Sequence, residues 1–438
     1  MTDAIDPYLL VRGASLYLAA IATGIAWIWR RPSPRVAAAA TLAFFWNLPA
    51  LLLLSVVAPR AGWWRFDANG GLLLGVPVDL LLAWSWMWGA VPILAFPDAP
   101  LWVVAAAAFA IDLVLMPAAA PVVRLGSTWL WGEAVAIAFL LVPAQLLARW
   151  TARGDRLPVR AALQVVAFTG LLLFVIPSIA VDGSGSGWIN PLSRTTWELG
   201  LMVQLLAVPA VLGLTAVQEF VTRGAGTPVP FDPPRRMVTS GVYAYIRNPM
   251  QLAAVLLLAL LGLALRNIWV AAAGVVAHLY STGLAGWDEN EDLIRRFGDD
   301  WTAYAHGVRR WVPRWRPWVP EGQPPARLFV AESCGMCSEV GRWFLRRRAR
   351  GLQIVAAESH PRLLRRVTYE SGDGRCTAAG IEAIARALEH VHLLWAFAAF
   401  VVRLPVIGAL VQLLADASGA EPRAARGESS TVTMARDG

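Results

Sequence analysis

Lysine is absent from this chain of 438 residues, so all 38 of its basic side chains are arginines. Charge of either sign is also scarce, at 16% of the residues, whereas 57% are hydrophobic. This balance argues against a fully soluble protein and predicts an α-helical polytopic membrane protein with a soluble part. We attribute the net charge of +8 to loops at the cytosolic membrane face, and we expect no nucleic-acid partner.

A cleavable leader is not visible either. The apolar run at 9–29 is long and lacks a basic segment ahead of it, so we interpret it as a membrane span. The lack of lysine, together with frequent alanine and arginine, is typical of a GC-rich bacterial genome. We therefore expect a multi-pass protein of the bacterial inner membrane.

Nine apolar runs are candidates to cross about 30 Å of hydrocarbon. They cover about 8–29, 36–58, 71–95, 101–118, 128–148, 159–181, 196–221, 249–265 and 267–286. The last two are short, and we expect them to form a hairpin that turns at Arg266 and Asn267. Arginines gather at 30–35, 149–160 and 223–236, which predicts an outside N-terminus and a cytosolic chain after Trp287.

Four polar residues lie within the first six runs: Asn47, Asp79, Asp112 and Glu133. Such groups are costly in lipid and usually face the interior of a helix bundle. They are consistent with a polar cavity for a lipid head group or a proton path. They are equally consistent with hydrogen bonds between helices, so the role of this half of the chain stays open.

The residues from 226 to 318 predict a site at one membrane face. A proline-rich loop leads to Arg247 and Pro249, and proline suits the first turn of a helix. After the hairpin an acidic helix follows at 288–304, in which Glu289 shares a face with the apolar Leu293 and Phe297. A glutamate there favours an inward role. Arg247 either offers a fork of donors to a carboxylate or reaches lipid phosphates.

Three shorter patterns belong to the same segment. Gly241 is suited to a positive φ and a close backbone approach. Tyr243 and Tyr245 either line a pocket or belong to an interfacial aromatic belt. Glu291 and Arg295, four residues apart, predict an exposed ion pair.

The stretch VTSGVYAYIRNPM at 238–250, followed by ENEDLIRRFGDDWTAYAHGVRRWVPR at 289–314, resembles the isoprenylcysteine carboxyl methyltransferase and phospholipid methyltransferase superfamily. The pattern of that superfamily runs SGPYRYVRHPMY and then EExxLxxxFGxxYxxYxxxVPR. The resemblance covers about 196–318 and implies a membrane-embedded enzyme that uses S-adenosylmethionine. The sequence departs from the pattern at Val242, Asn248, Gln251, Asn290 and Trp301.

The resemblance implies catalytic roles for Arg247 and Glu289. It implies a cofactor site that includes Gly241, Tyr243, Tyr245, Asn248, Pro249, Gln251 and Glu289, and no metal. The expected reaction transfers a methyl group to a carboxyl, amine or similar nucleophile of an isoprenoid- or lipid-like acceptor, with positioning as the main source of acceleration. The expected partners are the bilayer and a lipophilic small-molecule or lipidated substrate.

The segment RLFVAESCGMCSEVGRWFLRRRARGLQIVAA at 327–357 predicts the start of a thioredoxin-like unit. A strand leads to Cys334 and Cys337 at the start of a helix, and a second strand follows at 352–356. Arg342 and Arg346 on that helix would favour the thiolate. The segment resembles the DCC family of thiol–disulfide oxidoreductases, whose pattern is DGxCxxC. This implies a redox pair with a redox partner protein; a vestigial or structural pair, or metal binding with Cys376 and a histidine, are the alternatives.

The expected domains are a six-helix membrane region at 1–190, a methyltransferase-like membrane domain at 191–319, a linker at 320–326, a cytosolic thioredoxin-like domain at 327–418 and a disordered tail at 419–438. The apolar run at 393–402 is too short to span and predicts a core or interfacial helix. Two other functions remain open. One is a membrane-anchored thiol–disulfide oxidoreductase, and the other is a transporter-like or scaffold bundle that uses Asp79 and Asp112.

Overall fold

The computed structural model describes residues 6–188, 194–227, 234–332 and 335–420; at 284–289, 336 and 420 it describes the backbone alone. The chain is mostly helical, with a small α/β region near its C-terminus. Contacts divide it into two compact units. Unit 1 comprises Met1–Leu206, Ala225–Pro234 and Ala254–Leu279, and unit 2 comprises Ala207–Gly224, Arg235–Ala253 and Tyr280–Gly438.

Seven helices in the described residues are long and apolar enough to cross a membrane. They are Pro7–Arg30 (α1), Pro34–Val57 (α2), Val78–Ala95 (α3 to α4), Leu101–Ala118 (α5), Trp129–Arg153 (α6 to α7), Leu157–Gly183 (α8 to α9) and Thr196–Gly224 (α10 with η5). The other two predicted runs are also helical but shorter: α11 covers Pro249–Leu265 and α12 covers Ile268–Thr282. All nine runs therefore contain a helix, and seven of these helices have the length of a span.

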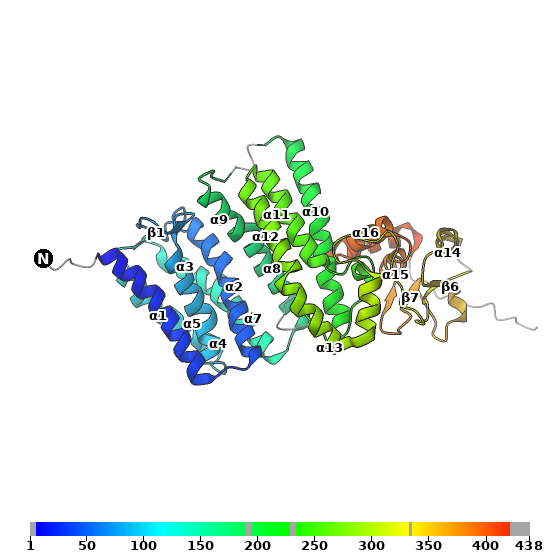
Figure 1. The fold of residues 1–438 in the computed structure, drawn as a ribbon, viewed down its shortest axis with the longest axis horizontal. Helices are drawn as coiled ribbons and strands as arrows, with labels where there is room; N and C mark the ends of the chain where they lie inside the picture. The colour runs from blue at the N-terminus through cyan, green and yellow to red at the C-terminus, as the bar shows by residue number, and fades with distance from the viewer. Residues whose placement is uncertain (1–5, 189–193, 228–233, 333–334, 421–438) are drawn as a thin grey trace, which may run out of the picture. The chain divides into compact units, whose positions relative to one another are not determined.

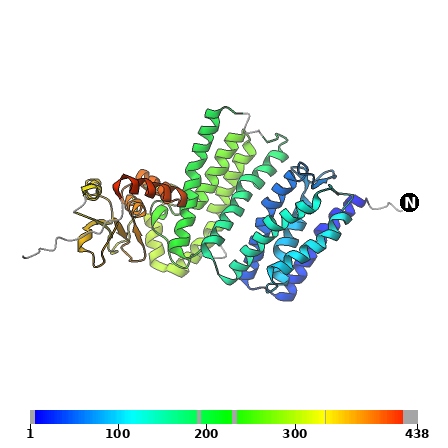
Figure 2. The ribbon, with the colours of Figure 1, turned by 180° about the vertical axis from the view of Figure 1, so that it is seen from behind.

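The first two helices begin where their sequences favour it. The side chain of Asp6 accepts a hydrogen bond from the amide of Tyr8 at 3.0 Å, and that of Ser33 accepts one from Val36 at 3.4 Å. Each cap is followed by a proline, whose missing N–H costs nothing in the first turn. In unit 1 the helices from α1 to α7 run side by side (Figure 1), as the view from behind also shows (Figure 2).

Three of the spans in unit 1 contain a wide π-helical turn just before a proline. These turns are η1 (Trp86–Ala90), η2 (Ile137–Leu141) and η3 (Leu171–Val175), and Pro92, Pro143 and Pro177 follow two residues later. Proline removes one N–H donor and crowds the carbonyl four residues earlier, so the helix widens there. The buried Gln145 donates to the carbonyl of Trp88 at 2.6 Å, the group that Pro92 would leave without its helical donor. A residue on another helix thus stabilises the break.

The predicted run at 71–95 begins differently from our expectation. Leu72–Leu73 (β2) and Val76–Pro77 (β3) form an antiparallel hairpin, and α3 (Val78–Ser85) starts only after it. Leu74 and Gly75 both have positive φ, which makes the turn of this hairpin. A second short pair joins β1 (Trp64–Phe66) to β4 (Val123–Leu125).

The turn between α11 and α12 lies where the sequence predicts it. Arg266 has a φ of 51°, and Asn267 accepts hydrogen bonds from the amides of Trp269 and Val270 at 2.9 and 3.1 Å. Gly262 allows the two helices to approach, because a Cβ there would lie 2.3 Å from the backbone nitrogen of Ala271. The predicted helical hairpin is confirmed.

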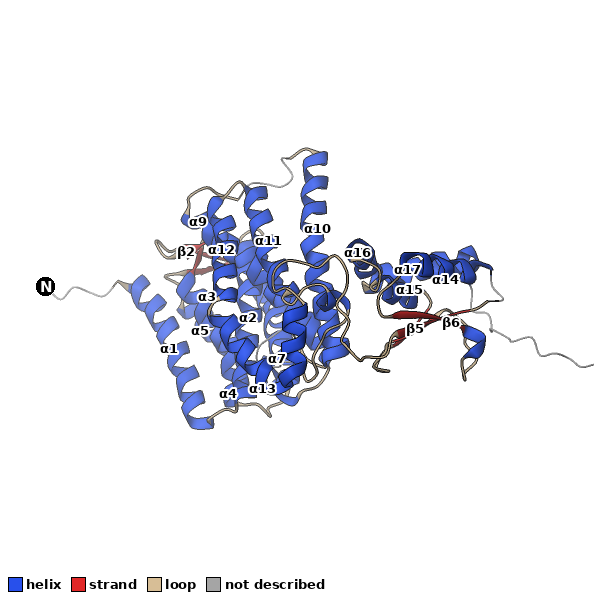
Figure 3. Cartoon of the chain, turned by 45° about the vertical axis from the view of Figure 1, so that its right-hand side comes forward, coloured by secondary structure: helices blue, strands red, loops and turns tan. Residues whose placement is uncertain are grey.

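The α/β region of unit 2 has a four-stranded sheet in the order β6-β5-β7-β8. Its elements are β5 (Ala326–Val330), α14 (Gly335–Arg347), β6 (Leu352–Ala356), β7 (Thr368–Glu370), β8 (Thr377–Ala379) and α15 (Ile381–Leu388). β5 and β6 are parallel, and the other pairs are antiparallel. In Figure 3 the helices α14 and α15 lie on one side of the strands, where Phe344 and Ala383 pack against Leu328. The predicted strand, helix and second strand are confirmed.

Two apolar helices close the described chain, α16 (Leu393–Val402) and α17 (Pro405–Ala415), bent by 91° relative to each other. Ala396 and Phe400 of α16 are fully buried in one hydrophobic cluster with Val242 and Tyr245. The run at 393–402 is thus a core helix of unit 2, one of the two alternatives that its length predicted.

Candidate functional site

The loop before α11 turns at a position that only glycine suits. Gly241 has a φ of +60° and opens the short helix η6 (Gly241–Ala244). A Cβ at this position would lie 2.7 Å from the carboxyl carbon of Glu219. The predicted positive φ is confirmed, and its reason is contact with α10 (Thr196–Glu219).

The two halves of the motif lie against each other in unit 2. The residues from 244 to 248 run beside the segment from 309 to 318, and four backbone hydrogen bonds of 2.8 to 3.3 Å join them. The pairs are Arg247 N to Arg309 O, Asn248 N to Arg310 O, Arg314 N to Tyr245 O, and Trp318 N to Ala244 O. Backbone pairing of this kind fixes where the side chains of the loop can lie.

Of the two predicted catalytic residues, only Arg247 has a described side chain. Its guanidinium carbon lies 5.8 Å from the centroid of the Trp301 ring, within the range of a cation–π contact. Trp301 also donates to Asn290 at 3.0 Å. Glu289 has its backbone in α13 (Leu284–Gly307), and its side chain lies outside the described residues.

The other predicted cofactor residues follow Arg247 directly. Asn248 donates from its side-chain amide to that of Gln251 at 2.8 Å, across the first turn of α11. Pro249 is buried and is the first residue of that helix. The structure thus brings Arg247, Asn248 and Gln251 to one helix start.

The two tyrosines of the loop have structural contacts. The hydroxyl of Tyr245 donates to the carbonyl of Glu389 at 2.7 Å, and burial raises the pKa of this phenol. Tyr243 stacks on Phe220 with 5.1 Å between ring centroids. Its carbonyl accepts a hydrogen bond from Tyr304 at 2.9 Å. A role in a cofactor site stays a prediction for both tyrosines.

Two details of the acidic helix differ from the prediction. Gly298 has φ 54° and ψ −127°, so α13 is broken there and is not continuous through 288–304. Arg295 bonds to the backbone carbonyl of Glu291 at 3.4 Å, whereas the i,i+4 ion pair between side chains joins Asp292 to Arg296 at 3.2 Å. The predicted pair is therefore wrong by one residue, because the side chain of Arg295 turns back to the helix backbone.

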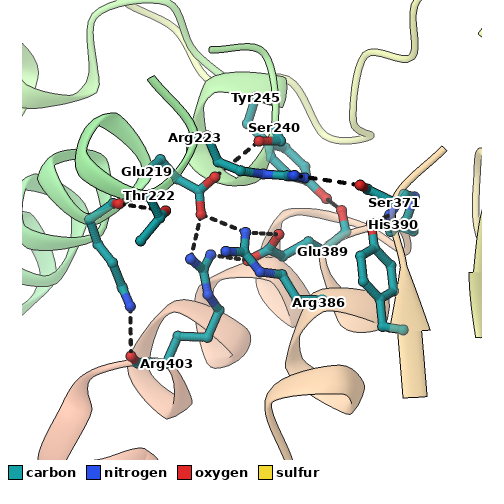
Figure 4. Close-up of polar contacts among 12 residues, drawn as sticks. Glu219, Thr222, Arg223, Ser240, Tyr245, Ser371, Arg386, Glu389, His390 and Arg403 are labelled. Atoms are coloured by element: carbon teal, nitrogen blue, oxygen red, sulfur yellow. Dashed lines mark hydrogen bonds and ion pairs between the residues drawn. The ribbon is translucent and has the colours of Figure 1, made fainter. Parts of the chain in front are cut away.

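A buried ionic network, which the sequence did not predict, lies beside the loop. Glu219 accepts hydrogen bonds from Arg386 at 2.6 Å and from Arg403, and Arg403 also donates to Glu389 at 2.5 Å (Figure 4). Ser240 donates to the second oxygen of Glu219 at 3.0 Å. We call Glu219, Arg386, Glu389 and Arg403 the ionic network. It connects the end of α10 to the α/β region.

The charges of the ionic network support one another. Burial by itself would lower the pKa of Arg386, but the carboxylates of Glu219 and Glu389 outweigh it and raise that pKa. Because isolated charges in a buried position are very costly, the four groups are stable only together. Single charges inside otherwise apolar stretches, such as Glu219 and Arg403, were the one signal in the sequence that pointed to this network.

The cysteine pair is only partly described. Cys334 lies outside the described residues, and Cys337 is half-buried in the first turn of α14. Arg342 and Arg346 are exposed on the same helix. Cys376 lies in the turn between β7 and β8, where its amide donates to the hydroxyl of Ser371 at 2.9 Å. No group of three potential metal ligands occurs within the ranges that the structure covers.

The polar residues of unit 1 fall into two classes. Asp79 pairs with Arg12 at 2.6 Å, which accounts for its charge. Asp112 is buried and accepts from the indole of Trp84 at 3.2 Å. Asp112 borders a small cavity of about 40 Å³, which the buried Glu133 also borders, and an apolar cavity of about 740 Å³. The larger one is lined mainly by α1 and α5, with further residues from the span Val78–Ala95.

Comparisons of the chain with protein-family models, curated proteins and solved structures find no match. The function is therefore inferred from the residues and contacts described above.

Proposed function

We propose that this protein is an S-adenosylmethionine-dependent methyltransferase that acts on a lipophilic acceptor dissolved in the membrane. The acceptor would be the carboxyl, amine or similar nucleophile of an isoprenoid- or lipid-like molecule. The observation that supports this most is the backbone pairing of 244–248 with 309–318. It joins the two motif segments on which the resemblance rests, although about sixty residues separate them.

The residues around Arg247 suit a zwitterionic cofactor. A guanidinium can hold the carboxylate of an amino acid in a forked pair. The face of Trp301, beside Arg247, can hold an aromatic base or a cationic sulfonium. The amides of Asn248 and Gln251 offer both donors and acceptors for hydroxyl groups.

The roles of the residues follow from this chemistry. S-adenosylmethionine, when bound, supplies an electrophilic methyl group on a sulfonium. Arg247 would orient the carboxylate of the cofactor or of the acceptor, and Glu289 would complete the polar ring. Tyr304 anchors the loop through the carbonyl of Tyr243, and burial raises the pKa of Tyr304 so that its hydroxyl stays a donor at neutral pH. Most of the acceleration would come from positioning.

Binding of the cofactor tests the proposal. The detergent-solubilised protein should bind S-adenosylmethionine saturably. Incubation with labelled cofactor, total membrane lipid and small isoprenoid thiols should then place label in one extractable acceptor. Absence of cofactor binding by folded protein contradicts the proposal, whatever the acceptor is.

The proposed orientation places the N-terminus outside and the C-terminal region in the cytosol of a bacterial inner membrane. Tags at the C-terminus and at Gly154, between α7 and α8, are expected to be protected from external labelling in whole cells. A tag at Gly185, after α9, should be accessible. The reason is the excess of arginine in the 149–160 segment and its absence from the Gly- and Ser-rich loop. An externally labelled C-terminal tag would overturn this orientation.

We further propose that the α/β region is an accessory thiol–disulfide domain of the thioredoxin-like class. A parallel strand–helix–strand unit followed by an antiparallel pair supports it, and Cys337 lies in the first turn of the helix. Cys376, by contrast, lies in a turn of the antiparallel pair.

Cys334 is expected to alkylate faster than Cys376 at neutral pH. In the sequence it directly precedes α14, and the helix dipole together with arginines on the helix is expected to favour a thiolate at that end. Mass spectrometry of the full chain after timed iodoacetamide treatment measures both rates, with Cys334→Ser and Cys376→Ser variants to assign the sites. Equal, slow rates at all three cysteines would support a vestigial pair instead.

A second candidate function, transport by the helices of unit 1, has one specific observation in its favour. The buried Asp112 borders the large apolar cavity, and it shares the lining of the small cavity with Glu133. Asp79 gives no such support, because Arg12 neutralises it. Cofactor binding discriminates between the two functions, since only the methyltransferase requires S-adenosylmethionine to bind.

A further inference from the structure

Unit 2 contains a cavity of about 130 Å³ that Gly241 borders but Arg247, Asn248 and Gln251 do not. The end of α10, the loop before η6 and the α/β region border it. This volume has room for a few water molecules or a small ion. Pockets for ligands of the size of S-adenosylmethionine are several times larger, at about 300–1,000 Å³. The occupant must therefore be small.

Four arginines contribute to the lining of this cavity. Arg223, Arg236, Arg375 and Arg386 all border the cavity, the first two from the α10 side and the last two from the α/β region. Arg236 and Arg375 are exposed, whereas the side chains of Arg223 and Arg386 are 12% and 4% exposed. Arg386 meets the carboxylate of Glu219 at 2.6 Å, whereas the carboxylate nearest to Arg223 among the described residues is that of Asp373 at 3.8 Å. A nearly buried guanidinium is costly unless an anion meets it.

Among the described residues, Arg223 and Arg386 each have an N–H donor that no acceptor meets. Arg223 reaches Ser371 at 3.5 Å, the outer limit of a hydrogen bond (Figure 4). Its distance to Asp373 is 3.8 Å. The Nε atoms of Arg223 and Arg386 have no hydrogen-bond partner among the described residues. A buried donor without an acceptor is costly, and each guanidinium has five N–H groups to satisfy.

The charge around the cavity is also unbalanced. Asp373 and Glu389 are the acidic residues in the lining, so four positive charges face two negative ones. Behind them, Glu219 and Arg403 of the ionic network offset each other.

His390, which also borders the cavity, adds no charge. Its Nδ1 donates to the carbonyl of Arg350 at 2.8 Å, and its Nε2 accepts from Tyr369 at 3.0 Å. Burial lowers the pKa of His390, so the ring stays neutral at pH 7. An excess of two positive charges remains.

We propose that this cavity binds a phosphate group. A doubly charged tetrahedral oxyanion matches the size, the charge excess and the unused guanidinium donors, since arginine forms forked, charge-assisted hydrogen bonds to phosphate. The same chemistry is presented by free phosphate and by the phosphomonoester of a lipid head group. Because arginines from α10 and from the α/β region meet there, the bound anion would hold these two parts of unit 2 together. This inference does not depend on methyl transfer.

Calorimetric titration of the full chain with inorganic phosphate tests it. The protein is purified in a detergent without phosphate, and chloride at matched ionic strength is the blank. Saturable binding with one phosphate per chain is expected. Arg223→Gln should weaken it about tenfold to a hundredfold, the loss expected for a charged hydrogen bond.

Because Arg223 is nearly buried, a second variant is needed to separate a loss of phosphate binding from a loss of folding. Arg236→Gln with Arg375→Gln changes only exposed side chains at the cavity and should also weaken binding. Arg365→Gln, an exposed arginine of the α/β region that does not border the cavity, is the control and should bind as the wild type does. Wild-type protein that binds no phosphate saturably overturns the proposal, as does an equal loss in the control.

A competition arm identifies the source of the phosphate group. Soluble short-chain phosphatidic acid that displaces phosphate would show that the site accepts a lipid head group. Phosphatidic acid that fails to compete, while phosphate binds, would restrict the site to the free anion. Either result is consistent with the proposed chemistry.

Discussion

Replacing Arg247 with alanine is expected to lower methyl transfer by about 10²-fold or more, and Glu289→Ala should have a similar effect. Arg247 precedes α11, and the backbone of Glu289 lies in α13, which follows α12. The hairpin of α11 and α12 returns the chain, so both residues can serve one polar ring. Initial rates with labelled S-adenosylmethionine, together with the dissociation constant of the cofactor, measure the effect.

The control is Asp292→Ala, three residues after Glu289 in the same helix. Its carboxylate pairs with Arg296 and is 47% exposed, so its loss should change activity little. Chromatographic profile and proteolytic resistance of each variant show whether the protein still folds. Asp292, at i+3, lies on the same side of the helix as Glu289. If Asp292→Ala is as damaging as Glu289→Ala, the effect is not specific to the carboxylate of Glu289. Unchanged cofactor affinity and turnover in Arg247→Ala and Glu289→Ala would refute the methyltransferase function.

Glu219→Ala is expected to destabilise unit 2 by about 3–5 kcal/mol, the usual effect of removing one partner from a buried ion pair. Glu219 is fully buried and accepts from Arg386 and Arg403. Without it, two buried guanidiniums would share the single carboxylate of Glu389. Proteolysis of the full chain in increasing urea, followed on the C-terminal fragment, measures the free energy of unfolding of this region.

Two variants make the experiment specific. Glu219→Gln keeps the shape but removes the charge, so it should recover only a small part of the lost stability. Glu339→Ala removes a carboxylate that is 77% exposed and 4.0 Å from Arg342, and should stay within about 0.5 kcal/mol of the wild type. A stable Glu219→Ala protein would show that the ionic network does not hold α10 to the α/β region.

The ionic network also explains why the contact that requires glycine at position 241 could not be predicted from the surrounding sequence. The sequence indicates a glycine that takes positive φ, and the structure agrees. What it meets there is Glu219, more than twenty residues earlier, and Ser240 donates to the same carboxylate. The motif loop therefore rests on charges supplied by Arg386 and Arg403 from the end of the chain.

Local patterns were sufficient for the helices. Each of the nine apolar runs contains a helix, although the run at 71–95 becomes helical only at Val78, and Asp6 and Ser33 stand at predictable caps. The turn at Arg266 and Asn267 follows from the break between two apolar runs and from an asparagine that can cap the next helix. The strand, helix and strand around the cysteine pair follow from composition in the same way. Hydrophobicity, periodicity and capping act over a few residues, so the sequence alone determines them.

Only the tertiary structure determined the partners of the buried polar groups, because these partners come from distant parts of the chain. Glu219 lies 167 residues from Arg386 and 184 from Arg403, and no local pattern relates them. Gln145 supports the break at Trp88 from a different helix, and Arg12 neutralises Asp79 across 67 residues. A buried polar group is stable only with a partner, and its partner is set by which segments the fold brings together.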